Sequence, residues 1–274
     1  MNVAQLQAKK ARGEPLVVLT CYDYPSALWQ EAAGVDIVFC ADSVGTNLLG
    51  YDDERQVTMD DMIHHLKAVR RGLTSGGSYL LADMPYGSCD TPEQALGNAL
   101  RFRSLGADGV KLEGFKPETV RLLRQRDIDV CCHLGLNPQI HVEKKLQART
   151  STDAIRLLGE CQALEQAGAQ FIVLEAIPER VGRIISERLS IPTIGIAAGR
   201  YTDGQVLVVT DALGVHDLAL RHVKRFAEIG VAAAAGVKQY VQEVRAGEFP
   251  AAEHAWKMKR QEAAAFDAWL ADQD

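Results

Sequence analysis

Eight short apolar runs constrain the fold of this chain more than any other feature. Most of them are separated by amphipathic stretches long enough to form a helix. The runs read LVVLT (16–20), DIVFCADS (36–43), SYLLADMP (78–85), GVKLEG (109–114), VCCHLG (130–135), FIVLEAIP (171–178), PTIGIAAG (192–199) and QVLVVTDALG (205–214). Strand–helix units repeated in this way are typical of a (β/α)₈ TIM barrel. The sequence therefore predicts an α/β fold with a closed parallel barrel.

Both ends of the chain extend beyond the eight predicted units. Residues 2–12 predict a short amphipathic helix before the first strand, and the pattern from about residue 217 onward predicts extra C-terminal helices. No linker-like composition divides the chain, so we expect one barrel domain over residues 1–274 with a helical tail at 217–274. The tail carries large aromatic side chains, which we expect to pack onto a subunit or the barrel wall rather than bind a cofactor: Trp256, Phe266 and Trp269.

Composition excludes several classes of function. The net charge is −6 and no stripe of Lys and Arg is present, which argues against a nucleic-acid partner. No run approaches the roughly 18 apolar residues of a membrane span, and residues 1–15 lack the apolar core of a signal peptide. The six cysteines form no C-x-x-C pair, which is typical of packed, reduced thiols. We therefore expect a cytoplasmic protein that does not interact with membranes.

Polar side chains stand at the ends of five of the predicted strands. In a TIM barrel, the carboxyl ends of the strands open onto the face where catalytic groups gather. Four carboxylates, one lysine and one imidazole at that face indicate a metal-assisted enzyme. The residues are Asp42 and Ser43, Asp83, Lys111 and Glu113, His133, and Glu175.

Three of these carboxylates indicate a metal site. Asp42, Asp83 and Glu113 come from neighbouring predicted strands, and oxygen ligands of this kind suit Mg²⁺. Without a cation, three carboxylates at one mouth would raise one another's pKa. Histidine and cysteine at zinc spacing are missing from the sequence, which argues against zinc. The alternative for either aspartate alone is a cap on the following helix.

The remaining polar strand ends have both a chemical and a structural interpretation. Lys111 and Glu113 lie two residues apart and therefore share a strand face, where they form either part of the site or a structural ion pair. His133 is either a site residue or a hydrogen-bonded core histidine. Glu175 interrupts the most apolar run, where burial raises the pKa of a carboxylate and makes it a proton acceptor near neutral pH. Its structural alternative is a pair with Arg180 or Arg183.

Motifs spread over residues 1–255 give the chain a resemblance to the ketopantoate hydroxymethyltransferase (3-methyl-2-oxobutanoate hydroxymethyltransferase) family, within the phosphoenolpyruvate mutase/isocitrate lyase type of barrels. The motifs are TCYDY (20–24), ADSVG (41–45), VTMDD (57–61), AVRRG (68–72), LLADMP (80–85), TPEQA (91–95), GVKLEG (109–114), CHLGLNPQ (132–139), LEQAGAQFIVLEAIP (164–178), IPTIGIAAGRYTDGQVLV (191–208), DALG (211–214) and FPAAEH (249–254).

The resemblance implies roles for individual residues and a set of ligands. The family's metal-binding aspartates match Asp42 and Asp83, with Glu113 near the metal through water. The residues that hold the 2-oxo acid match Ser43, Lys111 and His133, beside the two aspartates, and the proton acceptor matches Glu175. The resemblance also implies Mg²⁺, the co-substrate 5,10-methylenetetrahydrofolate, and a large homo-oligomer, commonly a decamer.

Some positions depart from the family pattern. Residues 143–149 read EKKLQAR where the family typically has a longer, glycine-rich loop near GGYKVQGR, and residues 195–199 read GIAAG instead of GIGAG. Thr46 and Ala41 replace the usual Met and Gly. The altered loop leaves open a related Mg²⁺-dependent barrel enzyme that condenses or cleaves a different 2-oxo acid. The rival from another class is a non-catalytic binding or scaffold protein.

Overall fold

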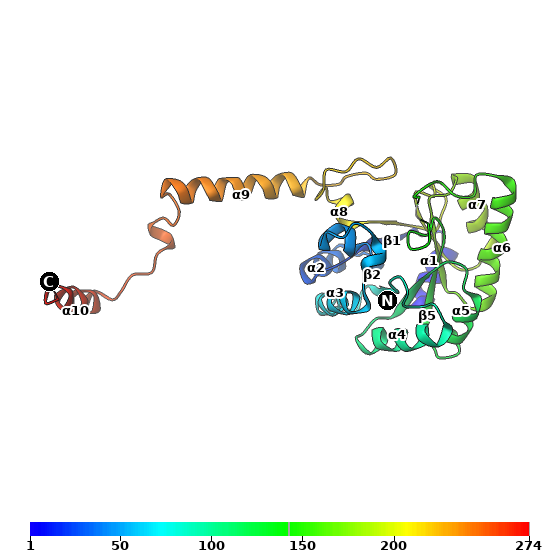
Figure 1. Ribbon diagram of the computed structural model, residues 1–274, viewed down its shortest axis with the longest axis horizontal. Coiled ribbons are helices and arrows are strands. Elements are labelled where there is room, and N and C mark those ends of the chain that lie inside the picture. The colour runs from blue at the N-terminus through cyan, green and yellow to red at the C-terminus, as the bar shows by residue number, and fades with distance from the viewer. Residues whose placement is uncertain (142, 274) are drawn as a thin grey trace.

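A computed structural model describes residues 1–141 and 143–273, and it contains a closed barrel of eight parallel strands in the order β1 to β8, with β8 paired to β1 (Figure 1). This confirms the predicted TIM barrel. The strands are β1 Leu16–Thr20, β2 Ile37–Cys40, β3 Tyr79–Asp83, β4 Gly109–Glu113, β5 Asp129–Gly135, β6 Phe171–Glu175, β7 Thr193–Ile196 and β8 Gly204–Leu207.

Helices surround the barrel and continue beyond it. The α-helices are α1 Val3–Ala11, α2 Tyr24–Ala33, α3 Met59–Gly72, α4 Pro92–Ser104, α5 Pro117–Arg124, α6 Ser151–Ala167, α7 Glu179–Arg188, α8 Val209–Ala212, α9 Ile229–Ala246 and α10 Arg260–Ala271. Local sequence explains several of their starts, because a side-chain oxygen accepts a first-turn N–H at Asp23, Thr58, Thr91 and Thr150.

The core lies inside the barrel and between the barrel and its helices. Every residue of β2, β3 and β4 is buried, which explains why these strands read as nearly continuous apolar runs. The charged residues among them, Asp83, Lys111 and Glu113, stand at or near the carboxyl ends. The apolar runs therefore form the barrel, and their polar ends are brought to one face.

The segment between β2 and α3 is longer than most connections in the barrel and contains two short helical turns. It forms a π-helical turn at Gly45–Leu49 and a 3₁₀ turn at Glu54–Gln56. Gly45 permits this because a Cβ there would lie 2.5 Å from Val57 Cγ2. Asp53 begins the second turn by accepting the Arg55 N–H. Single turns of this length carry too little periodicity to be recognised in a sequence.

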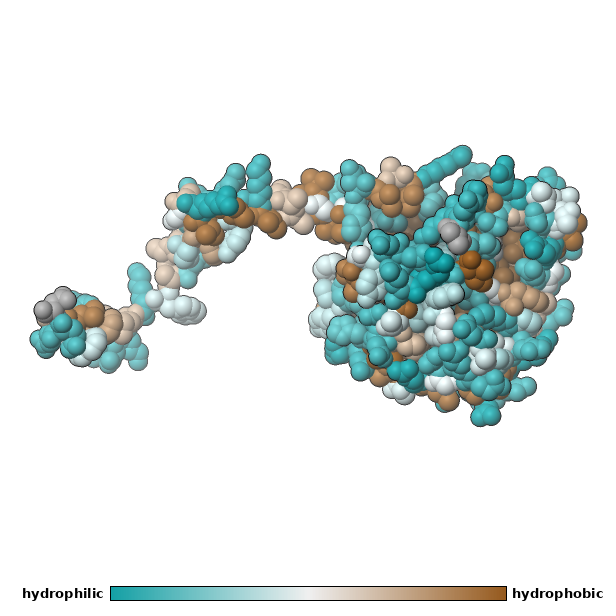
Figure 2. All heavy atoms as spheres, viewed as in Figure 1, coloured by the Kyte–Doolittle hydropathy of each residue, from teal (hydrophilic) through white to brown (hydrophobic). Residues whose placement is uncertain are grey.

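The C-terminal helices project away from the barrel (Figure 1), and no residue of α9 or α10 is buried. The first of them begins at Ile229. Residues 217–228 are therefore not helical, although the sequence pattern predicted helix from about residue 217. Trp256 is fully exposed and Phe266 and Trp269 are about half exposed, so these aromatics do not pack onto this chain's own barrel wall. Figure 2 shows apolar side chains on this projecting part.

The outer wall of the barrel is open where β1 meets β8. The helix after β8, α8, has only four residues. Val17 on β1 is 48% exposed and Gln205 on β8 is exposed, although outward-facing strand residues in a TIM barrel are normally covered by helices. Among the described residues, no helix is both long and apolar enough to cross a membrane.

Candidate active site

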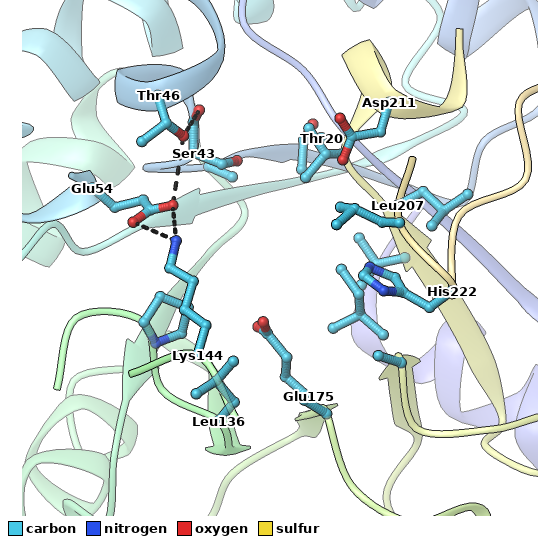
Figure 3. A pocket seen from close by; sticks show the side chains of 18 of the residues that line it. Thr20, Ser43, Thr46, Glu54, Leu136, Lys144, Glu175, Leu207, Asp211 and His222 are labelled. Atoms are coloured by element: carbon cyan, nitrogen blue, oxygen red, sulfur yellow. Dashed lines mark hydrogen bonds and ion pairs between the residues drawn. The ribbon is translucent and has the colours of Figure 1, made fainter. Parts of the chain in front are cut away.

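All seven polar residues singled out in the sequence line one cavity of about 820 Å³ at the carboxyl ends of the strands. Figure 3 shows part of this cavity, with Ser43 and Glu175 labelled. They come from β4, β5 and the ends of β2, β3 and β6, which are consecutive in the barrel. Strand register aligns them in pairs, because Asp83 is the partner of Lys111 and Glu113 is the partner of His133. The residues are Asp42, Ser43, Asp83, Lys111, Glu113, His133 and Glu175.

Lys111 is the cation at the floor of this cavity. Its buried Nζ donates to Asp83 Oδ2 at 3.0 Å and to Glu113 Oε1 at 3.1 Å. Burial lowers the pKa of Lys111, but the surrounding carboxylates outweigh burial and raise it well above its usual value. Burial likewise raises the pKa of Glu113, and the attraction of Lys111 and His133 reverses this and lowers it to about 2. The two groups are therefore both charged.

Asp42 and Asp83 are two buried carboxylates whose negative charges repel each other. The Asp42 N–H donates to Asp83 Oδ2 at 3.2 Å, and both side chains are buried. Burial, and then repulsion by Asp83, raise the pKa of Asp42 well above its usual value. Burial also raises the pKa of Asp83, although Lys111 opposes it. Because Lys111 is shared between Asp83 and Glu113, Asp42 and Asp83 are stable as two anions only when a further cation joins them.

The donor set offers a divalent cation two carboxylates. Within residues 1–141 and 143–273, no group of three or more His, Cys, Asp or Glu side chains is arranged as a complete metal site. Both carboxylate oxygens of Glu113 accept hydrogen bonds, from Lys111 and from the Gln139 N–H, whereas Asp83 accepts from Lys111 through Oδ2, so the available carboxylates are Asp42 and Asp83. Asp83 Oδ1 accepts no hydrogen bond from a described residue, although Lys111 Nζ lies 3.0 Å away. Two buried carboxylates fit Mg²⁺, which is commonly held by one or two carboxylates together with water or substrate oxygens.

His133 connects the lysine cluster to Glu175. Its Nδ1 lies 3.3 Å from Glu113 Oε1 and its Nε2 lies 3.1 Å from Glu175 Oε2, without the alignment of a hydrogen bond. Burial and the Lys111 charge lower the pKa of His133, but the two carboxylates outweigh them and raise it to about 9. The imidazole is therefore cationic at neutral pH.

Glu175 is less buried than its apolar surroundings in the sequence indicated. Its side chain is 21% exposed, and in Figure 3 it points into the cavity. The alternative of a pair with Arg180 or Arg183 is not seen among the described residues, because Glu175 pairs with His133 and Arg183 Nε donates to Glu187 at 2.8 Å. The exposure arises because Glu175 is the last residue of β6, so its side chain extends past the barrel core. A carboxylate in this position can reach a bound ligand.

Gln139 is a site residue that the sequence analysis did not single out. Its side-chain Nε2 donates to Asp42 Oδ2 at 2.8 Å, and its backbone N–H donates to Glu113 Oε2 at 3.0 Å. It therefore holds two carboxylates from different strands in place. The available signal was its position in the NPQ stretch directly after β5, but a glutamine's partners cannot be read from its own segment.

Two segments form the mouth of the cavity, residues 45–57 after β2 and residues 143–149 after β5. Lys144 Nζ donates to both carboxylate oxygens of Glu54, at 2.8 and 3.0 Å, and so joins the two segments (Figure 3). Lys145 pairs with Glu143 inside its own segment. Of the bulky charged residues that replace the glycine-rich loop, Lys144 is therefore the one that is joined to the opposite side of the mouth.

Known structures share this architecture. A phosphoenolpyruvate phosphomutase from Streptomyces platensis subsp. rosaceus superimposes with a TM-score of 0.61 at 14% identity, covering 100% of this chain and 96% of that one. A 2,3-dimethylmalate lyase of the phosphoenolpyruvate mutase/isocitrate lyase superfamily gives a TM-score of 0.58 at 16% identity, covering 98% of each chain. At these identities, the likeness supports the fold alone.

Sequence relatives are much closer. The 3-methyl-2-oxobutanoate hydroxymethyltransferase of Deinococcus radiodurans is 44% identical over 256 residues, which are 90% of this chain and 89% of the relative. The enzyme of the same name from Thermus thermophilus is 44% identical over 255 residues, covering 90% of this chain and 97% of the relative. The family profile described as ketopantoate hydroxymethyltransferase matches residues 1–252. This chain therefore belongs to the ketopantoate hydroxymethyltransferase family.

Proposed function

We propose that this chain transfers a hydroxymethyl group from 5,10-methylenetetrahydrofolate to 3-methyl-2-oxobutanoate, forming ketopantoate for pantothenate biosynthesis. Family membership over residues 1–252 supports the reaction. The observation that carries the mechanism is the single cavity in which Lys111, His133 and Glu175 face the buried pair Asp42 and Asp83.

The floor of the cavity suits an anionic 2-oxo acid. Lys111 and the protonated His133 supply two positive charges, and Ser43 supplies a hydroxyl at the same face. Lys111 and His133 are buried, so their attraction for a substrate carboxylate or keto oxygen is weakly screened. We assign Ser43, Lys111 and His133 to substrate binding, together with Asp42 and Asp83 through the metal.

Asp42 and Asp83 are assigned as the residues that hold Mg²⁺, with Glu113 nearby and connected through water. When bound there, Mg²⁺ would supply Lewis-acid polarisation of the substrate's keto group. Gln139 keeps Asp42 and Glu113 oriented while this happens, because it donates to both.

Glu175 is assigned as the base that removes the C3 proton of 3-methyl-2-oxobutanoate. It is the carboxylate with an exposed portion in the cavity, and it lies 3.1 Å from the positively charged His133. The electron pair left by the proton moves to the keto oxygen, where Lys111 stabilises the developing enolate charge. Water hydrolyses the methylene group of the donor to formaldehyde, which breaks both C–N bonds and leaves a proton on each folate nitrogen. C3 of the enolate then attacks the formaldehyde carbon, and the formaldehyde oxygen takes up a proton to become the hydroxyl group of the product.

The volume of the cavity supports a second, larger ligand. At about 820 Å³ it falls in the range of drug-sized binding pockets and exceeds what a five-carbon acid fills. Its outer part is lined by the 143–149 segment and by residues around His216 and His222. We assign this outer part to the folate donor. The alternative, a relative acting on a different 2-oxo acid, is not favoured by 44% identity over 90% of the chain.

We also propose a cytoplasmic homo-oligomer, with a decamer as the expected size. The exposed apolar side chains of α9, including Val231, Val237 and Tyr240, and the open wall at Val17 support assembly between copies. The six cysteines are all unpaired, which supports a reducing compartment. Sedimentation of the full chain and of a variant ending at residue 228 tests assembly, since the shortened chain should form smaller particles.

The decisive experiment follows the C3 proton of 3-methyl-2-oxobutanoate in D₂O. We expect Mg²⁺-dependent exchange without folate, and ketopantoate when 5,10-methylenetetrahydrofolate is added. The absence of exchange would reject the base and metal assignments. Exchange without product would support a barrel enzyme with another electrophile, and a non-catalytic scaffold would give neither result.

A further inference from the structure

Three hydroxyl groups form a chain that ends on Ser43. The Val209 N–H donates to Thr20 Oγ1 at 2.9 Å, and Thr20 Oγ1 lies 2.8 Å from Tyr22 Oη. Tyr22 Oη in turn lies 2.8 Å from Ser43 Oγ. Tyr22 and Thr20 are only 1% and 3% exposed. Thr20 and Ser43 line the cavity whereas Tyr22 does not, so Tyr22 can affect a bound substrate only through its neighbours.

The hydrogens available to these three hydroxyl groups determine which group donates and which accepts in each hydrogen bond. The backbone N–H of Val209 can only donate, so Thr20 Oγ1 accepts there and its own hydrogen is left for Tyr22 Oη. Tyr22 then has one hydrogen and one acceptor within reach, Ser43 Oγ. If Ser43 donated to Tyr22 instead, Tyr22 Oη would accept from both Thr20 and Ser43, and its own buried hydrogen would have no partner, which is costly. Ser43 therefore accepts from Tyr22 and keeps its own hydrogen free.

We infer that Tyr22 and Thr20 are positioning residues that make Ser43 a hydrogen-bond donor aimed into the cavity. The inference rests on the proposed function and adds a specificity rule to it. A fixed donor at this point selects a ligand that offers an acceptor, such as the carboxylate of the 2-oxo acid. The corresponding amide, which also presents N–H hydrogens, matches this site less well.

The chain also offers a matched control. Tyr79 is a second buried tyrosine, 1% exposed, whose Oη lies 3.3 Å from Asp129 Oδ2. It is the first residue of β3, at the opposite end of the strand from Asp83, and it does not line the cavity. Tyr79→Phe therefore removes a buried tyrosine hydroxyl without disturbing Ser43.

The experiment compares these variants in the full-length enzyme with Mg²⁺ and the folate donor. Tyr22→Phe should raise KM for 3-methyl-2-oxobutanoate by about 5- to 10-fold with kcat changed less than about twofold, because an oriented binding interaction is lost. It should also reduce the preference for the acid over its amide. Thr20→Val should also raise KM, whereas Thr20→Ser should keep the wild-type KM because it retains the hydroxyl. Tyr79→Phe should leave KM unchanged.

A double-mutant cycle decides whether Tyr22 acts through Ser43. In a Ser43→Ala background, Tyr22→Phe should cause no further increase in KM. An equal increase in KM in both backgrounds would show that Tyr22 does not act through Ser43. The same conclusion would follow if Tyr22→Phe left KM unchanged and lowered thermal stability only as much as Tyr79→Phe does. Wild-type enzyme without turnover of the 2-oxo acid would instead reject the proposed function. Crystal structures of the ligand-free proteins would still test the role of Tyr22. Ser43 should adopt one rotamer in the wild type and several rotamers in Tyr22→Phe.

Discussion

The floor and the mouth of the cavity hold charges in opposite ways. At the floor, Asp83, Lys111 and Glu113 are at most 3% exposed, and Lys111 donates to both carboxylates at about 3 Å. At the mouth, the side chains of Lys144 and Lys145 are 56% and 72% exposed, although Glu54, the partner of Lys144, is only 12% exposed. Removing one partner of a buried ion pair leaves an uncompensated charge, whereas an exposed pair contributes little. The floor should therefore control the chemistry and the mouth should tune access.

The largest expected effect comes from the metal-binding pair. Asp42→Ala or Asp83→Ala should reduce Mg²⁺-dependent turnover by more than about 10⁴-fold, because each removes a charged ligand and with it several kcal/mol of stabilisation. Turnover at limiting and excess Mg²⁺ measures this, with circular dichroism as the control for folding. Full activity of either variant at limiting Mg²⁺ would show that the metal lies elsewhere.

Glu175→Gln separates the base from the ligands of the floor. It keeps the size of the side chain and removes the proton acceptor, so turnover should fall by about 10²- to 10⁴-fold while the 2-oxo acid still binds. Calorimetric binding and C3 exchange in D₂O report the two functions separately. Glu179→Gln, at an exposed Glu–Arg pair on α7, is the control. If the variant no longer bound the 2-oxo acid but still exchanged its C3 proton, Glu175 would be a binding residue and not the base.

The raised pKa of His133 should make the stability of the metal-free protein depend on pH. Its folded pKa of about 9 exceeds the unfolded value of about 6.5. Its stabilisation is therefore fully present below pH 6.5 and disappears as the pH rises through 9, by up to about 3 kcal/mol. Urea unfolding with EDTA at several pH values should show this slope in the wild type and in the exposed control His64→Gln. A His133→Gln variant with the same slope would contradict the assignment.

The smallest effect is expected at the mouth. Lys144→Met removes the link to Glu54, so the 143–149 segment can move aside for the donor. KM for methylenetetrahydrofolate should therefore fall by about 2- to 5-fold, since a partly exposed pair is worth about 1 kcal/mol. The charge-reversed pair Glu54→Lys with Lys144→Glu should restore the original KM. Lys145→Met, which removes the same charge without crossing the mouth, should have less effect.

The rate of C3 exchange tests whether the floor and the mouth act independently. It should remain unchanged in the three variants of the mouth, because none of them alters the groups around the 2-oxo acid. Equally large changes in exchange and donor use would place the 143–149 segment in the 2-oxo acid site. That outcome would favour a different substrate.

The sequence predicted the barrel and the grouping of polar strand ends because both depend on a repeated local pattern. Parallel strands carry their final residues to one face, so Asp83 and Glu175 could be placed together without knowing any distance. Gln139 and Tyr22 could not be found this way, because their partners lie on other strands. The exposed portion of Glu175 depends on where β6 ends, which an apolar run does not reveal.

The tail was predicted least well, for a related physical reason. A helical pattern specifies an amphipathic face but not the surface that covers it. Residues 217–228 lack helix, and α9 presents its apolar side chains to solvent within this chain. The sequence could not show that the tail leaves the barrel wall open.

In the proposed homo-oligomer, the uncovered outer surface at Val17 and Gln205 would make the stability of each copy depend on protein concentration. Water contacts the strands there in an isolated copy, and each copy carries an apolar helix with no buried residue. When another copy covers that surface, binding adds to the free energy of unfolding by an amount that grows with the logarithm of protein concentration. The midpoint of thermal unfolding should therefore rise as the protein is concentrated, and a strongly diluted enzyme should lose activity over time.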